Sequence, residues 1–124
     1  MAQDTISKTD TVLDFSDINP EFIGGESAMS DFIRNEFSYP EEAREMGEQG
    51  LVFVEFIVQS DGSITDVKTV KSVSKSLDAE AERVIKAMPK WKPGEQDGVP
   101  VNVRYTVPFK CVLATSKKRK LFRR

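Results

Sequence analysis

The side chains that could do acid–base chemistry are carboxylates gathered on one short segment. Glu41, Glu42, Glu45 and Glu48 lie close together in the sequence, and paired carboxylates can serve as general acid and general base. Solvated charges on a helix surface explain this cluster better. The chain has no histidine and one cysteine, Cys111, so an intrachain disulfide and a His/Cys zinc site are excluded, and a serine or cysteine nucleophile lacks its usual base. We therefore predict that the protein is not an enzyme, with no catalytic residues, no metal and no cofactor.

The composition predicts one folded domain. With 124 residues, of which 39% are hydrophobic and 31% charged, the chain can bury one core and is too apolar to be disordered throughout. Its longest apolar stretch, Leu51 to Val54, is far short of the roughly 20 residues that a membrane helix needs. No signal peptide begins this sequence. We expect a protein that is either cytosolic or freed of its leader.

Charge is distributed unevenly along the chain. The net charge is −2, but Lys117 to Arg124 holds six basic and no acidic residues, which leaves −8 on residues 1–116. This tail, with Leu121 and Phe122 among its basic residues, could touch anionic lipid headgroups or an acidic partner, although a solvated tail is the better explanation. An acidic body repels the phosphate backbone, so we expect no nucleic-acid partner.

Apolar residues at helical spacing predict three helices. The first covers Ser27 to Phe37. Pro40 suits the first turn of the second, where its missing N–H is not needed, and this helix ends near Met46. The third is capped by Ser76 and ends before Pro89.

Two stretches of alternating apolar and polar residues predict strands. Gly50 to Gln59 is followed by a turn at Asp61-Gly62, so Ile64 to Val70 returns antiparallel to it. A turn-rich stretch then precedes a strand over Val99 to Phe109. Together these elements predict an α+β fold with two layers, in which helices pack on one face of a three-stranded antiparallel sheet.

Two prolines suggest that the last strand lies at an edge of the sheet. Pro100 and Pro108 flank its centre, and proline is tolerated in sheets chiefly at edges because it cannot donate to the ladder. An unpaired edge can accept an extended peptide as an added strand. The alternative is that the prolines and Arg104 only protect this edge against aggregation, and the pattern alone favours neither.

The order of several short motifs resembles the C-terminal domain of TonB energy transducers. The resemblance covers roughly residues 39–110. The segment Glu21 to Glu26 and the helix after it resemble the extension that precedes this domain in Bacteroidetes-type members. The motifs are Tyr39-Pro40-Glu41-Glu42-Ala43-Arg44, Gly50, Asp61-Gly62, Leu77-Asp78-Ala79-Glu80-Ala81, Pro89-Lys90-Trp91-Lys92-Pro93-Gly94, Gly98-Val99-Pro100-Val101 and Tyr105-Thr106-Val107-Pro108.

The resemblance implies a periplasmic peptide-binding module. Such a domain pairs with the TonB box, a short extended segment of outer-membrane TonB-dependent transporters, and takes part in energy transduction for nutrient uptake. The candidate peptide-binding residues that it implies are Tyr39, Pro40, Val101, Asn102, Val103, Arg104, Tyr105, Thr106 and Val107.

Four regions are expected along the chain: a flexible or loosely docked arm (1–20), a helical extension (21–38), the TonB-like domain (39–112) and the basic tail (113–124). The sequence shows neither the membrane anchor nor the proline-rich spacer of a complete transducer. It is therefore either a fragment of a protein that is anchored in the inner membrane and contacts its proton-channel complex, or a free periplasmic protein. A structural or signalling adaptor that uses the same strand for a partner or a homodimer is the alternative function.

Three single residues allow both a structural and a functional interpretation. Trp91 and Tyr105 could offer aromatic platforms to a ligand, but their positions favour packing in the core. Cys111 is interpreted as a small buried hydrophobe, and an intermolecular disulfide is the alternative.

Overall fold

The computed structural model describes residues 11–113, and the structural statements below concern this part of the chain. The predicted basic tail Lys117 to Arg124 and the first ten residues lie outside it. The elements in chain order are β1 (Val12–Leu13), α2 (Gly25–Glu36), α3 (Glu41–Met46), β2 (Gly50–Val58), β3 (Ile64–Lys71), α4 (Lys75–Lys86), β4 (Gly94–Gln96) and β5 (Val99–Cys111).

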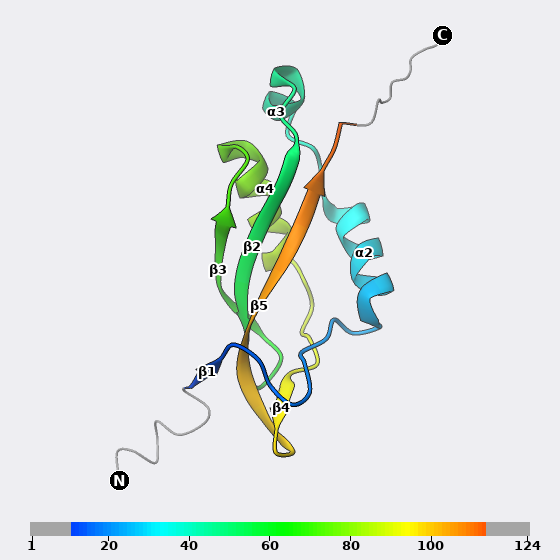
Figure 1. Cartoon of the computed structure of the whole chain (residues 1–124). Helices are drawn as coiled ribbons and strands as arrows, with labels where there is room; N and C mark the ends of the chain where they lie inside the picture. The colour runs from blue at the N-terminus through cyan, green and yellow to red at the C-terminus, as the bar shows by residue number, and fades with distance from the viewer. Residues whose placement is uncertain (1–10, 114–124) are drawn as a thin grey trace.

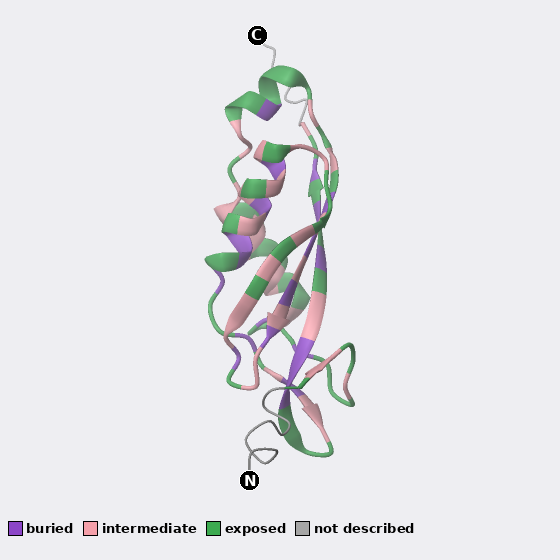
Figure 2. Cartoon of the chain, turned by 90° about the vertical axis from the view of Figure 1, so that its left-hand side faces the viewer, coloured by how far each residue is buried: buried purple, intermediate pink, exposed green. Residues whose placement is uncertain are grey.

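The helices lie on one face of the sheet, and the other face is uncovered (Figures 1 and 2). This confirms the predicted two-layer α+β fold. The sheet has five strands instead of three, in the order β1-β5-β2-β3, with β4 paired to β5 as well. It is also mixed, because β1 runs parallel to β5 while the other pairs are antiparallel. Strands of two and three residues are too short to show a period, which is why the sequence did not reveal them.

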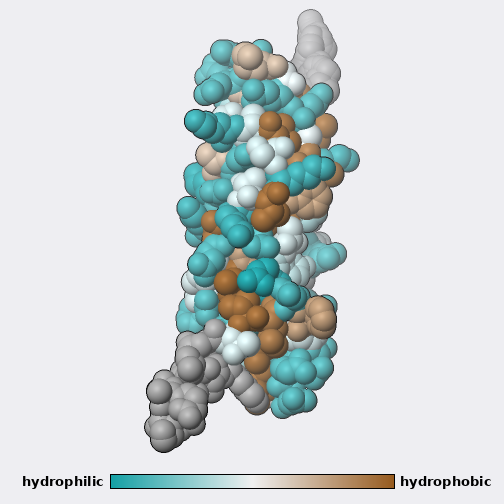
Figure 3. All heavy atoms as spheres, turned by 60° about the vertical axis from the view of Figure 1, so that its left-hand side comes forward, coloured by the Kyte–Doolittle hydropathy of each residue, from teal (hydrophilic) through white to brown (hydrophobic). Residues whose placement is uncertain are grey.

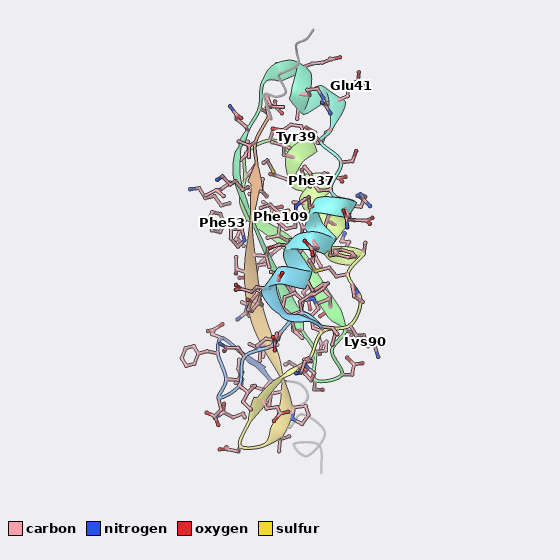
Figure 4. The ribbon with its side chains drawn as sticks, turned by 90° about the vertical axis from the view of Figure 1, so that its right-hand side faces the viewer. Phe37, Tyr39, Glu41, Phe53, Lys90 and Phe109 are labelled. Carbon is pink, nitrogen blue, oxygen red and sulfur yellow. The ribbon has the colours of Figure 1, made fainter. Side chains whose placement is uncertain are left out.

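The centre of the sheet is β2, which pairs with β3 on one side and β5 on the other. Its alternation works as predicted, because Val52, Val54, Phe56 and Val58 face the helices and are fully buried. Each such side chain contributes about 1.5–3 kcal/mol of transfer free energy. The opposite side chains of β2 face outward, as Phe53 does in Figure 4.

The uncovered face carries apolar residues, but charged side chains divide them. Lys68 and Arg104 both pair with Glu55 near the middle of this face. Seen from the side of β3 and this face, hydrophobic patches alternate with hydrophilic ones (Figure 3). The face therefore does not offer one continuous apolar docking surface.

The structure confirms the predicted turn after β2 and corrects the predicted cap of α4. The Asp61-Gly62 turn does join β2 to β3, with Gly62 at φ +90°. The cap of α4 is Ser74, whose hydroxyl accepts a hydrogen bond from the N–H of Leu77, so the prediction of Ser76 as cap was wrong by two residues. The earlier cap lets the helix begin two residues sooner, at Lys75.

The segment from residue 11 to 21 is bound to the sheet along its length. After β1, the backbone of Ile18 bonds with Glu95, and that of Glu21 bonds with Lys92. Gly94 allows the close approach, since a Cβ there would contact Ser16, Val103 and the carbonyl oxygen of Ile18 at less than 3 Å. The arm predicted over residues 1–20 is thus paired with the sheet from residue 12 onward.

Trp91 is buried at the centre of an aromatic cluster, which confirms its interpretation as a packing residue. Its ring makes edge contacts with Phe22, Phe56 and Tyr105, with centroids 5.9, 5.3 and 5.2 Å away. Tyr105 is only half-buried, and it packs against the same cluster. This cluster links β2, β5 and the segment that leads into α2.

Candidate functional site

The neighbours of β5 change along its length, and this defines the candidate site. One side of β5 pairs with β2 from Val103 to Cys111. On the other side β1 pairs with Asn102 and Val103, while β4 pairs with Val99 to Val101 beyond the end of β2. Within residues 11–113, no strand pairs with that second side from Arg104 onward. We call the stretch Arg104–Cys111 the open edge.

The open edge covers only part of the strand that the sequence predicted to be unpaired. Asn102 and Val103 already have β1 as a strand partner on their second side, and Val101 pairs with β4. Asn102 is also buried, and its side-chain oxygen accepts a hydrogen bond of 2.7 Å from the N–H of Ser60, which holds the loop after β2. Alternation identifies a strand but not its neighbours, so the sequence did not show that this end of β5 is covered.

The other predicted strand residues lie on the open edge and face in alternating directions. Arg104 and Thr106 point to the uncovered face, where Arg104 forms ion pairs with Asp14 and Glu55. Tyr105 and Val107 face the helices, and Val107 is buried. A peptide that binds between the open edge and the helices can therefore contact the backbone of this stretch and its helix-facing side chains. It cannot contact the side chains of Arg104 and Thr106, which point to the uncovered face.

Tyr39 lies near the Cys111 end of β5. Its hydroxyl donates a hydrogen bond to the carbonyl oxygen of Glu48, just before β2, and its ring makes an edge contact with Phe37, 6.0 Å away. Burial, followed by the charges of Cys111 and Glu48, raises the pKa of this hydroxyl, and Arg44 partly opposes the shift. Tyr39 therefore remains a neutral donor that fixes the turn into β2.

The predicted site residues do not form one cluster. Val101 lies at the opposite end of β5 from Cys111 and hence from Tyr39, a separation of roughly 33 Å along an extended strand. Pro40 is the cap that precedes α3, and with Tyr39 and Arg44 it lines a groove against α4 to which β5 contributes nothing. Tyr39 thus lies close to the Cys111 end of the open edge, whereas Val101 to Val103 lie toward the opposite end of β5.

A groove of about 370 Å³ lies beside the open edge. Helix α2 forms one wall and the last four residues of β5 form the other, and Figure 4 shows Phe37 and Phe109 between them. The ring centroids of these two residues are 6.3 Å apart. The groove is lined by Ser30, Ile33, Arg34, Phe37, Pro108, Phe109, Lys110 and Cys111.

Sequence reasoning missed this groove because the candidate peptide-binding residues on the last strand stopped at Val107, although the predicted strand ran to Phe109. The alternation in fact continues through Phe109 and Cys111, which are both buried. The amphipathic pattern of α2 was recognised, but a helical pattern does not say beside which strand the helix lies. The continued period after Pro108 was the available signal.

Cys111 is buried, as predicted, and burial followed by the charge of Asp78 raises the pKa of its thiol to about 11 from an ordinary value of 9. Because the folded-state pKa lies above the unfolded value, stability is unaffected below about pH 9 and falls as the pH rises through 9 toward 11. We expect the denaturation midpoint in urea to drop between pH 8 and pH 10.5, and the drop to be smaller in Cys111→Ala. An equal drop in both proteins would show that Cys111 does not ionise with a raised pKa.

Other kinds of site find no support among residues 11–113. No three His, Cys, Asp or Glu side chains lie close enough together there to hold a metal ion. The carboxylates of Glu41, Glu42 and Glu45 on α3 are exposed. None of the helices in this part of the chain has both the length and the apolar character to cross a membrane.

Comparison with known proteins agrees with the geometry. The family described as Gram-negative bacterial TonB protein C-terminal matches residues 35–113, which is more than half of the chain. No curated protein matches the chain significantly.

Solved structures of TonB C-terminal domains resemble this one. The domain of Helicobacter pylori TonB is 28% identical, with a TM-score of 0.54, over 68% of this chain and 77% of that one. The domain of Pseudomonas aeruginosa TonB is 27% identical, with a TM-score of 0.48, over 81% and 92% of the two chains. The family match begins at residue 35, so nearly all of α2 lies outside it. The chain belongs to the family of TonB C-terminal domains.

Proposed function

We propose that this domain binds the TonB box of an outer-membrane transporter by adding it as a strand to the open edge. The observation that carries the proposal is the pairing of β5, which has β2 on one side of Arg104–Cys111 and a groove on the other. An unpaired edge presents a row of N–H and C=O groups that an extended peptide can satisfy. Pro108 removes one of these donors, and a sheet edge is where strands tolerate proline.

Membership of the family of TonB C-terminal domains supports a broader role in energy transduction. As a TonB-type domain, the chain acts in the periplasm and contributes to energy transduction toward TonB-dependent transporters. Contact with an inner-membrane proton-channel complex would require a further segment that anchors it there.

Titration of ¹⁵N-labelled protein with TonB-box peptides tests the proposed mode of binding. We expect the largest amide shifts at Arg104–Cys111 and along α2, and small shifts on β3, which lies at the other edge of the sheet. Shifts confined to β3, or none at millimolar peptide, would rule out addition at the open edge.

Backbone methylation of the peptide provides a sharper control. Only alternate residues of an added strand direct their N–H groups at the neighbouring strand. Of two peptides that are N-methylated at odd or at even positions, one should lose binding at least tenfold and the other should retain it. Equal losses would indicate that the peptide is not bound as a strand.

The same edge could pair with a second copy of this chain, which is the alternative function. Sedimentation equilibrium across a range of concentrations measures it directly. A dimer that dissociates on peptide addition would show that both use the open edge, and a dimer unaffected by peptide would place self-association elsewhere.

A further inference from the structure

Strand β1 lies on the same side of β5 as the open edge and ends where the open edge begins. In the sheet order β1-β5-β2-β3, β1 and β2 lie on opposite sides of β5. β1 pairs with Asn102 and Val103, and the open edge starts at the next residue, Arg104. A strand added to the open edge that reached past Arg104 would therefore meet β1.

We propose that β1 competes for the edge of β5 and is displaced by a bound peptide strand that is long enough to reach Asn102. In the absence of such a peptide, β1 satisfies the backbone groups at this end of the edge. This inference rests on the proposed function and adds its regulation by the chain itself. β1 precedes residue 35, where the family match begins, so the competition is not part of what the family motifs describe.

Few contacts hold β1 in place. It has two residues and pairs in parallel, the arrangement that is slightly less stable per residue. Val12 and Leu13 are half-buried, and neither packs against the hydrophobic core that contains Trp91. Asp14 forms an ion pair with Arg104, but its side chain is 71% exposed, and exposed pairs contribute little to stability. Exchanging β1 for another strand therefore breaks few favourable contacts.

The segment between β1 and α2, by contrast, is held firmly beside β4. The N–H and C=O groups of Ile18 both bond with Glu95, at 3.0 and 2.9 Å. Those of Glu21 both bond with Lys92, at 3.0 and 2.8 Å. Phe15, which lies between β1 and these bonds, is 80% exposed. The chain before Phe15 can therefore leave β5 while the segment after it stays in place.

The competition depends on the length of the peptide. A peptide as long as the open edge, about eight residues, leaves β1 in place. A longer strand that continues over Val103 and Asn102 gains two residue pairs with β5, but β1 loses the same two. The longer peptide therefore gains little affinity from its extra residues as long as β1 is present.

Peptides of two lengths test the inference. The parent is a TonB-box peptide of about eight residues that shifts the amides of Arg104–Cys111. It is lengthened by Thr-Val-Thr at its N-terminus or at its C-terminus, so that one extension runs over Val103 and Asn102 and the other runs past the end of β5. We expect all three peptides to bind the unaltered protein within threefold of one another. At saturation only the first extension should shift the amides of β1.

The double variant Val12→Pro/Leu13→Pro removes both N–H groups of β1 and so abolishes its pairing with β5. The peptide that extends over Asn102 should bind this variant at least fivefold more tightly than the unaltered protein, because its extra pairs no longer replace those of β1. The affinities of the parent and of the other extension should change less than twofold. Val12→Ala/Leu13→Ala, which keeps the backbone groups, is the matched control and should leave all three affinities within twofold.

Three results would overturn the inference. If neither extended peptide gains more than twofold in the proline variant, β1 does not compete for the edge. If one gains, but the amides of β1 stay in place when that peptide saturates the unaltered protein, β1 is not displaced. In both cases the parent peptide still shifts the amides of Arg104–Cys111, and strand addition stands. If no peptide shifts those amides at millimolar concentration, strand addition itself fails.

Discussion

Replacing Gly62 by alanine is expected to destabilise the domain by about 3 kcal/mol or more. Gly62 has φ +90°, and an added Cβ would overlap the carbonyl oxygen of Trp91. Its own carbonyl oxygen accepts a hydrogen bond of 2.8 Å from the N–H of Trp91. A side chain at this position thus adds backbone strain of about 1–2 kcal/mol and forces the two segments apart. For a domain whose total stability is about 5–15 kcal/mol, this is a severe change.

Gly47→Ala is the matched control for this prediction. Gly47 also has positive φ, +69°, at the end of α3, but no atom lies near a Cβ built there. Urea denaturation followed by Trp91 fluorescence should therefore show a loss of about 1 kcal/mol for Gly47→Ala. Equal losses in the two variants would mean that strain alone acts at Gly62 and that its contact with Trp91 is unimportant.

The contact at Gly62 also affects the proposed site. Trp91 joins the loop after β2 to Tyr105 on β5, so its position affects the Tyr105 end of the open edge. The loop and the site are connected through a single indole.

The elements that could be predicted from the sequence are those long enough to show a period or marked by a turn. β2 alternates over nine residues, and the Asp61-Gly62 turn determines that β3 returns beside it. α4 has an apolar stripe and a serine cap near its start. These features, with the motifs shared with TonB C-terminal domains, sufficed for the fold class.

The position of the open edge could not be predicted, because it depends on contacts between segments far apart in the chain. β1 covers Asn102 and Val103 from a distance of about 90 residues in the sequence, and its two residues show no pattern. The groove depends on where α2 lies, and neither the amphipathic pattern nor the family motifs specify this. The same limit explains why Tyr39 and Val101 were grouped together although they lie at opposite ends of β5.

The second large effect is expected for Phe56→Ala, which should cost about 4 kcal/mol. Phe56 is fully buried on β2, and its ring makes contacts at 5.3 Å with Trp91 and 5.9 Å with Tyr105. Its removal leaves a cavity at the junction of β2, β5 and the loop that carries Trp91. Such sites collapse poorly because β2 and β5 are held in register by their ladder.

Phe53→Ala, three residues earlier on the same strand, is the control for Phe56→Ala. Phe53 projects from the uncovered face, as Figure 4 shows, and the ammonium of the exposed Lys71 lies 5.7 Å from its ring centroid. We expect a loss of about 1 kcal/mol or less in urea denaturation. If Phe53→Ala cost as much as Phe56→Ala, the uncovered face would contribute to stability as strongly as the core does. We expect instead a much larger loss of stability for Phe56→Ala than for Phe53→Ala. Substitutions on the uncovered face would then have little effect, while substitutions in the core beneath Tyr105 would also affect the open edge.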